Sequence, residues 1–556
     1  MKKTSFYFLQ IVSTILIVFS LTFGQQPVTA PAKSETSLTI SERETAKHIK
    51  VERITEITTK LSAPEMEGRG TTAPGGEKAA KYIAEQFQQL GLKPLGDKNS
   101  YLQQIPFRYQ TISEQTSIEI GETKLKFIED FAVLPPQATQ SIEVKGELVF
   151  VGYGAVSPEI KHDDYANLDL KGKIALVMFG RPKANTPFEG KVFAPNVVIE
   201  NLLKRGVIGI VAIESARNLS SNFSETAKFL ARPRLVLPNT NEAVHVPSIL
   251  VANSVSEKIF ASTDTSLDKL AEKALNNEYV SFNLKKDMAI KIAIKSEDKT
   301  GNNVVAILEG SDEKLKEEAL VYSAHYDAYG KNAEGVIYPG AADNALGVAT
   351  MLSLAEAFTK APKARRSIIF MAVTGEERGL LGSRYWVNSP TWPLEKVAAN
   401  INFDGIGTEI YGPVKQIVGY GMEHSDLGQI MTEVAIASGC TVLPDPFPSE
   451  RVFYRSDHFS FVQKGIPAIM VNGVMEGDTE KILERAQKYL ANDYHKPTDI
   501  IRPDWHWDGP RQVAAVGFVM GLRIVNSNEM PKWKENSEFN RPRNLQPTPK
   551  TSKDKE

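Results

Sequence analysis

The segment Ser367-Ile-Ile-Phe-Met-Ala-Val-Thr-Gly-Glu-Glu377 joins a run of mainly apolar residues to a glycine and two adjacent carboxylates. A short apolar run that ends at a turn residue is typical of a buried β-strand. Similar runs occur at Val304–Leu308, Ala319–Ser323 and Val397–Phe403, and helical periodicity appears between them, first at Ala345–Phe358. Strands that alternate with helices of about 10–15 residues predict an α/β fold with a mostly parallel twisted sheet and helices on both faces.

Histidines and carboxylates directly follow three of these strands: His325 and Asp327, then Glu376 and Glu377, then Asp404. In open α/β sheets the ligand crevice lies beyond the carboxyl ends of the strands, so we expect these side chains to meet at one edge. Asp343 opens the helix Ala345–Phe358 beside Asn344, which can cap that helix. A cluster of histidine and carboxylate groups suits zinc or a similar divalent cation.

Such a cluster suits the hydrolysis of a peptide bond. Two metal ions about 3.5–4 Å apart can activate one water molecule and stabilise the developing oxyanion. A carboxylate that is not a ligand can take the proton of the water and pass it to the leaving amine. Successive residues of an extended segment point in opposite directions, so Glu376 and Glu377 can divide the tasks of ligand and base. Periodicity alone does not decide which glutamate does which.

Five motifs, in chain order, resemble those of the co-catalytic zinc peptidases, metallopeptidase family twenty-eight. That family includes bacterial aminopeptidases and glutamate carboxypeptidase. The motifs are His325-Tyr-Asp327, Gly340-Ala-Ala-Asp343-Asn344-Ala-Leu-Gly-Val348, Gly375-Glu376-Glu377, Asn402-Phe-Asp404 and Tyr494-His495-Lys-Pro-Thr-Asp499. The resemblance implies a sheet of the zinc-exopeptidase type and two zinc ions. It implies that His325 and Asp404 hold one zinc, that Glu377 and His495 hold the other, and that Asp343 bridges them.

The resemblance also implies roles for residues that do not bind metal. Glu376 would be the general base, Asp327 would orient His325, and Tyr494 would stabilise the tetrahedral intermediate. A substrate pocket would be lined by Arg455, Ser456, Asp457 and His458, with Arg455 near a charged terminus of the substrate. The contiguity of Ser456, Asp457 and His458 argues against a serine-protease triad, because triad members converge from distant positions.

The sequence pattern changes at about residue 140. Short strand-like runs separated by glycine and proline follow, and they predict a β-rich module. Val144–Gly154 and Leu170–Ile174 resemble parts of a protease-associated domain that is inserted in such peptidases. The insertion would divide the peptidase domain. The expected parts are residues 43–135 (peptidase domain, N-terminal part), 136–290 (insertion), 291–528 (metal-binding part) and 529–556, a polar tail predicted to be disordered.

The N-terminus indicates export. Lys2 and Lys3 precede an apolar run from Phe6 to Phe23 and then small residues, as in a secretory signal. We therefore predict a signal peptide over residues 1–30 and a linker over 31–42. The alternative is an uncleaved anchor, since about 18 apolar residues nearly suffice to span a bilayer. Either way the body of the protein leaves the cytoplasm, to be periplasmic or secreted.

The composition of the chain limits the classes of binding partner that we expect. The chain has 65 Lys and Arg residues and 67 Asp and Glu residues, so its net charge of −2 gives no reason to expect nucleic acid. Its one cysteine, Cys440, cannot form an internal disulfide. We expect peptide or protein substrates, no stable membrane span in the mature chain, and zinc or another divalent transition metal such as cobalt or manganese.

The predicted function is that of an exported aminopeptidase, which hydrolyses the N-terminal peptide bond of its substrate. A carboxypeptidase or dipeptidase is the alternative on the same scaffold, because the metal ligands are shared and only the pocket differs. A non-catalytic, peptidase-like binding protein is a further alternative, and the complete ligand set argues against it. The sequence does not indicate an oligomeric state.

Overall fold

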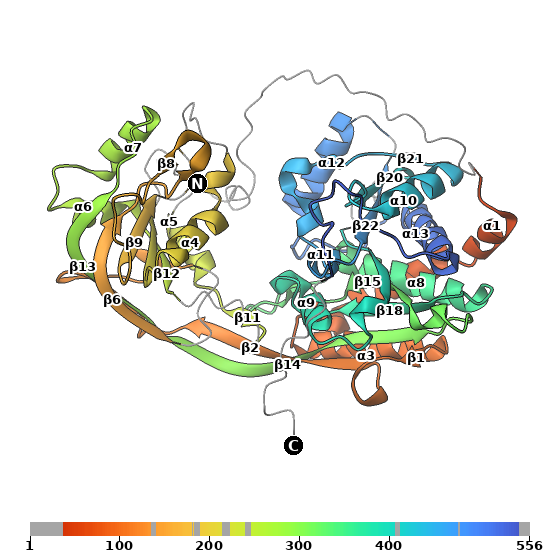
Figure 1. The fold of residues 1–556 in the computed structure, drawn as a ribbon. Coiled ribbons are helices and arrows are strands. Elements are labelled where there is room, and N and C mark those ends of the chain that lie inside the picture. Colours follow the sequence, from red (N-terminus) through yellow and green to blue (C-terminus); the bar gives the residue numbers. More distant parts are fainter. Residues whose placement is uncertain are drawn as a thin grey trace. The chain divides into compact units, whose positions relative to one another are not determined.

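The computed structural model describes residues 37–134, 141–178, 180, 182, 190–213, 223–238, 246–405, 412–475, 477 and 479–543. The predicted signal peptide lies outside these ranges. None of the helices in the described part of the chain combines the length and apolar character needed to cross a membrane. The described residues form two compact units (Figure 1). We call residues 108–298 the inserted unit, and residues 37–107 with 299–543 the main unit.

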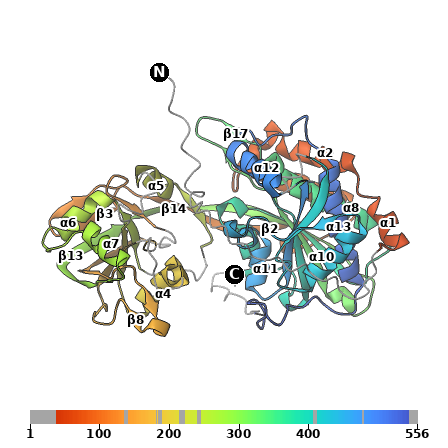
Figure 2. The same ribbon diagram turned by 90° about the horizontal axis from the view of Figure 1, so that it is seen from above.

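A large mixed sheet forms the centre of the main unit. Its order is β11-β2-β14-β18-β15-β19-β22-β20-β21, where β11 (Arg234–Val236) pairs with residues 108–110 of β2, and β1 pairs with β14. The bounds are β1 (Lys93–Pro94), β2 (Leu102–Ile112), β14 (Ile294–Leu308), β15 (Ala319–His325), β18 (Ser367–Val373), β19 (Val397–Asn402), β20 (Val414–Tyr420), β21 (Thr441–Val442) and β22 (Ala468–Met475). The central strands β18, β15, β19 and β22 are parallel. This confirms the predicted α/β fold. Figure 2 shows α8 (Leu346–Lys360), α10 (Asp426–Ala437) and α13 (Asp508–Asn526) together on one side of the strands.

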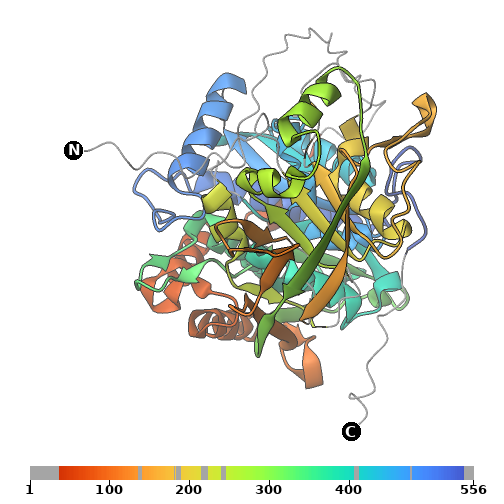
Figure 3. The ribbon, with the colours of Figure 1, turned by 90° about the vertical axis from the view of Figure 1, so that its left-hand side faces the viewer.

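The inserted unit has its own eight-stranded sheet among the described residues (Figure 3). Its strands, in sheet order, are β4 (Thr123–Leu125), β3 (Ser117–Ile120), β13 (Phe282–Ile292), β6 (Ile142–Phe150), β9 (Ile174–Met178), β10 (Gly209–Ile213), β12 (Ser248–Val251) and β5 (Phe131–Val133). Four helices pack on it: α4 (Pro195–Lys204), α5 (Phe223–Leu230), α6 (Ser256–Phe260) and α7 (Leu267–Leu275). The unit begins at Arg108 rather than at the expected residue 136, because β3, β4 and β5 pair into this sheet.

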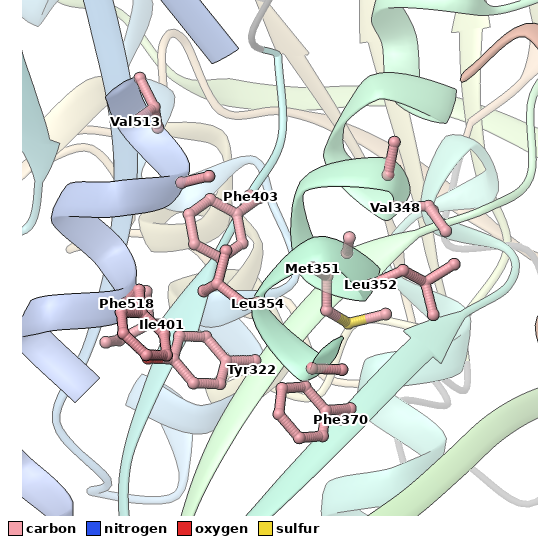
Figure 4. Close-up of a cluster of buried hydrophobic side chains, with 14 of the residues drawn as sticks. Tyr322, Val348, Met351, Leu352, Leu354, Phe370, Ile401, Phe403, Val513 and Phe518 are labelled. Atoms are coloured by element: carbon pink, nitrogen blue, oxygen red, sulfur yellow. The ribbon is translucent and has the colours of Figure 1, made fainter. Parts of the chain in front are cut away.

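The two faces of the main sheet bury separate cores. On one face, Tyr322 of β15 stacks between Phe370 and Phe403, with ring centroids 5.6 and 6.1 Å away, and its hydroxyl donates to the Gly517 carbonyl of α13 (2.8 Å) (Figure 4). The helices α2 (Val51–Ser62) and α3 (Pro74–Gln89) pack against this core too. On the other face lie residues of α9 (Leu381–Asn388) and α11 (His458–Gln463), such as Trp386. Because the sheet is buried on both faces, the sequences of these strands are continuous apolar runs.

Both ends of the described chain differ from expectation. A helix, α1 (Ile40–Ala46), begins inside the predicted linker and is capped by Thr39. The tail from residue 529 was expected to be disordered, yet residues 529–543 pack on the main unit. The indole of Trp533 donates to the Gly465 carbonyl (3.0 Å), and Phe539 is only 6% exposed. These two aromatic residues bury apolar surface that the polar composition of the segment conceals. Residues 544–556 lie outside the described ranges.

Candidate metal centre

The carboxyl ends of adjacent parallel strands bring the predicted ligands together. His325 is the last residue of β15, Asp404 lies two residues beyond β19, and Glu377 lies in the single turn Glu376–Arg378 that follows β18. His495 comes from the loop after α12 (Thr479–Asn492). Four segments of the main unit therefore deliver one ligand each to the same edge, as expected for an open α/β sheet.

Asp343, the fifth predicted ligand, lies in a short π-helical turn, Ala341–Ala345, ahead of α8. Its neighbour Asn344 accepts a hydrogen bond from the Gly347 amide (3.0 Å) and so holds the start of α8, as the sequence suggested. The side-chain amide of Asn344 also donates to the Phe403 carbonyl (2.9 Å). This bond ties the turn of Asp343 to the residue next to Asp404.

A first group of possible metal ligands consists of His325, Asp343 and Asp404. Nε2 of His325 lies 3.0 Å from Oδ1 of Asp404 and 3.2 Å from Oδ1 of Asp343. The side chain of His325 is 1% exposed. Burial lowers the pKa of this imidazole, but the Asp404 carboxylate and its other acidic neighbours raise it well above its usual range. A divalent cation can supply the positive charge that these carboxylates attract.

A second group consists of Asp343, Glu377 and His495. Nε2 of His495 lies 3.1 Å from Oε2 of Glu377 and 3.2 Å from Oδ2 of Asp343. Asp343 belongs to both groups and presents a different oxygen to each, so its carboxylate can bridge two cations. This shared carboxylate is the feature that distinguishes the arrangement from two unrelated clusters.

The residues of both groups fit metal ions in their chemistry. All five offer imidazole nitrogen or carboxylate oxygen, the donors that zinc takes in catalytic sites. Oε1 of Glu377 is buried and makes no hydrogen bond with the described residues. Burial of an unpaired oxygen costs free energy, which a cation bound next to it would offset. Burial raises the pKa of Glu377 to about 7, and the Asp343 carboxylate raises it as well. Binding of a cation would favour the ionised form of this carboxyl group.

Glu376 lies beside the two groups and belongs to neither. Its Oε2 is 4.0 Å from Nε2 of His325, and its amide donates to Oδ1 of Asp327 (3.2 Å). Burial raises the pKa of the Glu376 carboxyl group well above its usual range. The structure thus separates the two adjacent glutamates, with Glu377 among the possible ligands and Glu376 free of them, a distinction that periodicity could not make.

Asp327 and Ser456 hold the first group in place. Nδ1 of His325 lies 3.2 Å from the backbone carbonyl of Asp327 and 3.7 Å from its carboxylate, so the main-chain oxygen is the nearer of the two possible partners. The carboxylate accepts instead from the Thr71 hydroxyl (2.8 Å). The Ser456 hydroxyl donates to Oδ2 of Asp404. Ser456, expected in the substrate pocket, therefore supports a possible ligand.

Two supporting residues of the second group received no role from the sequence. The hydroxyl of Tyr329 lies 2.9 Å from Nδ1 of His495, and the carboxylate of Asp499 accepts from the amides of Ala342 (2.9 Å) and Asp343 (3.1 Å). Asp499 is the last residue of the motif Tyr494–Asp499, and this was the one feature of the sequence that could have indicated its role. No feature of the sequence indicated a role for Tyr329.

The predicted catalytic and pocket residues have different surroundings. The Tyr494 ring stacks on His495 with centroids 3.6 Å apart, so it lies beside the second group of possible ligands. Arg455 is exposed and pairs loosely with Glu450 (3.8 Å). Asp457 and His458 are completely buried, in contrast to the expectation that they line a substrate pocket, because no solvent reaches either side chain. A small, partly open pocket is lined by the second group itself, together with Tyr329, Tyr338, Gly340 and Lys496.

Residues 303–518 match the model of Peptidase family M28. This part, less than half of the chain, is similar to that family. The match contains all five possible metal ligands and both candidate catalytic residues, Glu376 and Tyr494. The recognition made from the motifs is therefore confirmed for the metal-bearing part of the chain.

Curated relatives match a comparable share of the chain. A probable leucine aminopeptidase 2 of Aspergillus fumigatus is 28% identical over 218 residues, which are 36% of this chain and 40% of that protein. A vacuolar membrane protease of Clavispora lusitaniae is 27% identical over 190 residues, 34% of this chain and 16% of that protein. The chain thus spans less than half the length of either relative.

The fold is similar to that of a solved structure, the aminopeptidase from Aneurinibacillus sp. strain AM-1. The TM-score is 0.51 at 20% sequence identity, and the superposition covers 88% of this chain and 97% of that one. At this identity the likeness bears on the fold alone. It extends over more of the chain than the family match does.

Proposed function

We propose that this chain is a zinc-dependent aminopeptidase, which hydrolyses the N-terminal peptide bond of peptides with the help of two metal ions. The observation that carries the proposal is the position of Asp343, whose two carboxylate oxygens face His325 and His495, one each. Two trios of ligands that share one carboxylate can hold a pair of closely spaced cations. The similarity to a probable leucine aminopeptidase 2 favours the N-terminal bond over the C-terminal one.

The five ligands would divide between the ions as the two groups do. His325 and Asp404 would hold one zinc, Glu377 and His495 the other, and Asp343 both. Zinc in these positions would polarise the scissile carbonyl and make a water molecule more acidic. The protein contributes a buried, acidic site in which electrostatic interactions are stronger than in water.

Glu376 would act as the general base. Its carboxyl group is not among the ligands, and burial raises its pKa well above the usual range. A carboxylate with a raised pKa can take a proton from the attacking water and deliver it to the amine that leaves. Tyr494, stacked on His495, would stabilise the negative charge of the tetrahedral intermediate through its hydroxyl.

We propose in addition that the chain is exported and that the inserted unit is a protease-associated domain. The charged and apolar order of residues 1–30 supports export. The resemblance of Val144–Gly154 supports the domain assignment, and this stretch covers most of β6. Sequencing the N-terminus of the protein recovered outside the cytoplasm tests the first point. Recovery of the intact N-terminus would contradict cleavage after residue 30.

A panel of substrates tests the central proposal. The full chain, loaded with zinc, is assayed against chromogenic aminoacyl amides, N-blocked peptides with free C-termini, and dipeptides. We expect cleavage of the aminoacyl amides, loss of activity with a chelator, and recovery with about two equivalents of zinc. Preferential release of C-terminal residues would replace the aminopeptidase by a carboxypeptidase. Failure of the zinc-loaded protein to cleave any of them would overturn the enzyme assignment.

A further inference from the structure

Arg69 is a completely buried arginine at the end of the turn Pro64–Arg69. Its guanidinium donates only to main-chain oxygens: Nε to Tyr326 (2.7 Å), Nη1 to Leu61 (2.7 Å) and Pro339 (2.5 Å), and Nη2 to Gly340 (2.7 Å). Among the described residues it forms no ion pair. Burial of a charge is expensive, so a cation held entirely by carbonyl oxygens calls for an explanation.

Three of the four accepting carbonyls, those of Tyr326, Pro339 and Gly340, belong to the two loops that carry possible metal ligands, and the fourth, that of Leu61, belongs to α2. Tyr326 lies between His325 and Asp327, and Gly340 comes three residues before Asp343. Both loops are more than 250 positions away from Arg69 in the sequence, at separations of 257 and 271 residues. One planar guanidinium therefore fixes the distance between the loop of His325 and the loop of Asp343.

The backbone next to Arg69 is closely packed at Gly340 and Gly68. A Cβ atom on Gly340 would lie 2.8 Å from Nη2 of Arg69, and Gly340 has a φ of 56°, so glycine is required there. A Cβ atom on Gly68 would lie 2.5 Å from the carbonyl oxygens of Gly330 and Tyr338. The Gly68-Arg69 pair thus fits closely against the loop between the two sets of ligands.

The charge of Arg69 also lies near the acidic site. Burial lowers the pKa of Arg69 to about 10, so the guanidinium remains charged at neutral pH, and the carboxylates of Asp499, Asp327, Asp343 and Glu377 oppose this shift. By the same interaction the guanidinium offsets the mutual repulsion of the carboxylates when no metal is bound.

We propose that Arg69 is a positioning residue of the metal centre: its fork of N–H donors sets the spacing of the His325 and Asp343 loops and so preforms both metal sites. The inference rests on the metal ligands of the proposed function, but it concerns affinity for metal rather than the bond that is cleaved. Geometry dominates over charge in this role, because a lysine keeps the charge yet cannot reach four carbonyls from a single nitrogen.

Arg366 provides a matched control. It is 1% exposed, lies in the same unit, and its guanidinium also donates to main-chain carbonyls, including that of Ile524 (3.1 Å), besides Glu318 (2.7 Å). It immediately precedes β18, whereas Glu376 and Glu377 follow that strand, so it lies at the opposite end from the metal ligands. Loss of Arg366 should affect stability without affecting the geometry of the centre.

The test compares Arg69→Lys and Arg69→Met with Arg366→Lys and Arg366→Met in the full chain. Zinc affinity is measured by competition with a chromogenic chelator, and thermal unfolding is followed in the metal-free proteins. We expect both Arg69 variants to bind zinc at least about tenfold more weakly, the effect typical of residues that orient metal ligands, and the Arg366 variants to bind it normally. If Arg69→Met does not fold, Arg69→Lys carries the comparison.

Each other outcome has a definite meaning. Normal zinc affinity in a folded Arg69→Lys would overturn the geometric role. Equal weakening in the Arg366 variants would reduce the effect to general destabilisation and would overturn it too. Failure of the wild type itself to bind zinc would refute the proposed function, which separates that failure from the failure of this inference.

Discussion

The hydroxyl of Tyr329 lies 2.9 Å from Nδ1 of His495, while Nε2 of the same imidazole faces Asp343 and Glu377. A histidine that binds metal through Nε2 carries its proton on Nδ1 and donates it to a fixed acceptor, which holds the ring in position. Burial raises the pKa of Tyr329, so its hydroxyl remains a neutral acceptor at any physiological pH.

Replacing Tyr329 by Phe should therefore weaken the second metal site. Without the hydroxyl, Nδ1 of His495 loses its partner, and we expect affinity for one of two zinc ions to fall about tenfold or more. Sequential zinc titrations with a chelator measure this. Tyr338→Phe is the control, because the Tyr338 ring lies 6.2 Å from that of Tyr329 and makes no hydrogen bond to His495 among the described contacts. Identical titrations for the two variants would exclude the predicted role of Tyr329.

Glu376→Gln and Glu377→Gln should behave differently although the residues are adjacent. Glu376 is in neither ligand group, so its variant should retain two zinc ions and lose about 10²–10⁴-fold in kcat, the contribution typical of a general base. Glu377→Gln should lose one zinc, because Glu377 contributes a ligand oxygen near His495. Metal analysis and single-turnover kinetics on both variants decide this. Wild-type kcat in Glu376→Gln would rule out its role as the base.

His458 should make stability depend on pH. Burial lowers the pKa of this histidine from 6.5 to about 4, so the folded protein holds the proton more weakly than the unfolded chain. Its contribution to stability is complete above pH 6.5 and is lost as the pH falls toward 4, by about 3 kcal/mol in all. Denaturant unfolding at several pH values should show a smaller loss on acidification in His458→Gln than in the wild type. His506→Gln, at an exposed position, is the control and should follow the wild type.

Phe539 should matter for stability despite its place in a polar segment. It is 6% exposed and packs against Phe453 and Trp533, with ring centroids 5.6 and 5.7 Å away. Truncation to alanine should lower the free energy of unfolding by about 3 kcal/mol or more. Phe229→Ala, where the side chain is 59% exposed, should change it by no more than about 0.5 kcal/mol. Equal denaturation midpoints would indicate that residues 529–543 do not pack on the main unit in solution.

Four of the five possible ligands follow a strand or open a helix, and these positions are visible in local periodicity. His495 lies in a loop after α12, and only the resemblance of its motif pointed to it. The parallel sheet and its edge then follow from general rules of α/β folds. Residues whose partners are distant in the sequence could not be predicted, because local periodicity does not reveal such contacts. Arg69 and Tyr329 contact partners 271 and 166 positions away, and nothing in their neighbouring residues signals that contact. Phe539 was missed because average composition hides a single buried side chain.

The boundary of the insertion shows the same limit. Strand pairing decides it, and β3 joins the sheet through β13, whose residues lie some 170 positions later, as in the pair Ile118 and Ile290. A single strand does not reveal its partner. The prediction that Asp457 and His458 line a substrate pocket was wrong for a different reason. A motif places residues near a site but does not show which side chains are exposed to solvent.

The main unit is assembled from both sides of the insertion, and this fixes when it can bind metal. Arg69 leaves the ribosome early, yet its acceptors at Tyr326 and Gly340 are synthesised more than 250 residues later, and His495 later still. A nascent fragment that lacks His495 lacks one of the possible ligands, so the proposed metal pocket is complete only after that residue has been synthesised. If the chain crosses the membrane before it folds, its ions must come from the compartment in which it arrives, and the metal supply there would decide which cation it carries.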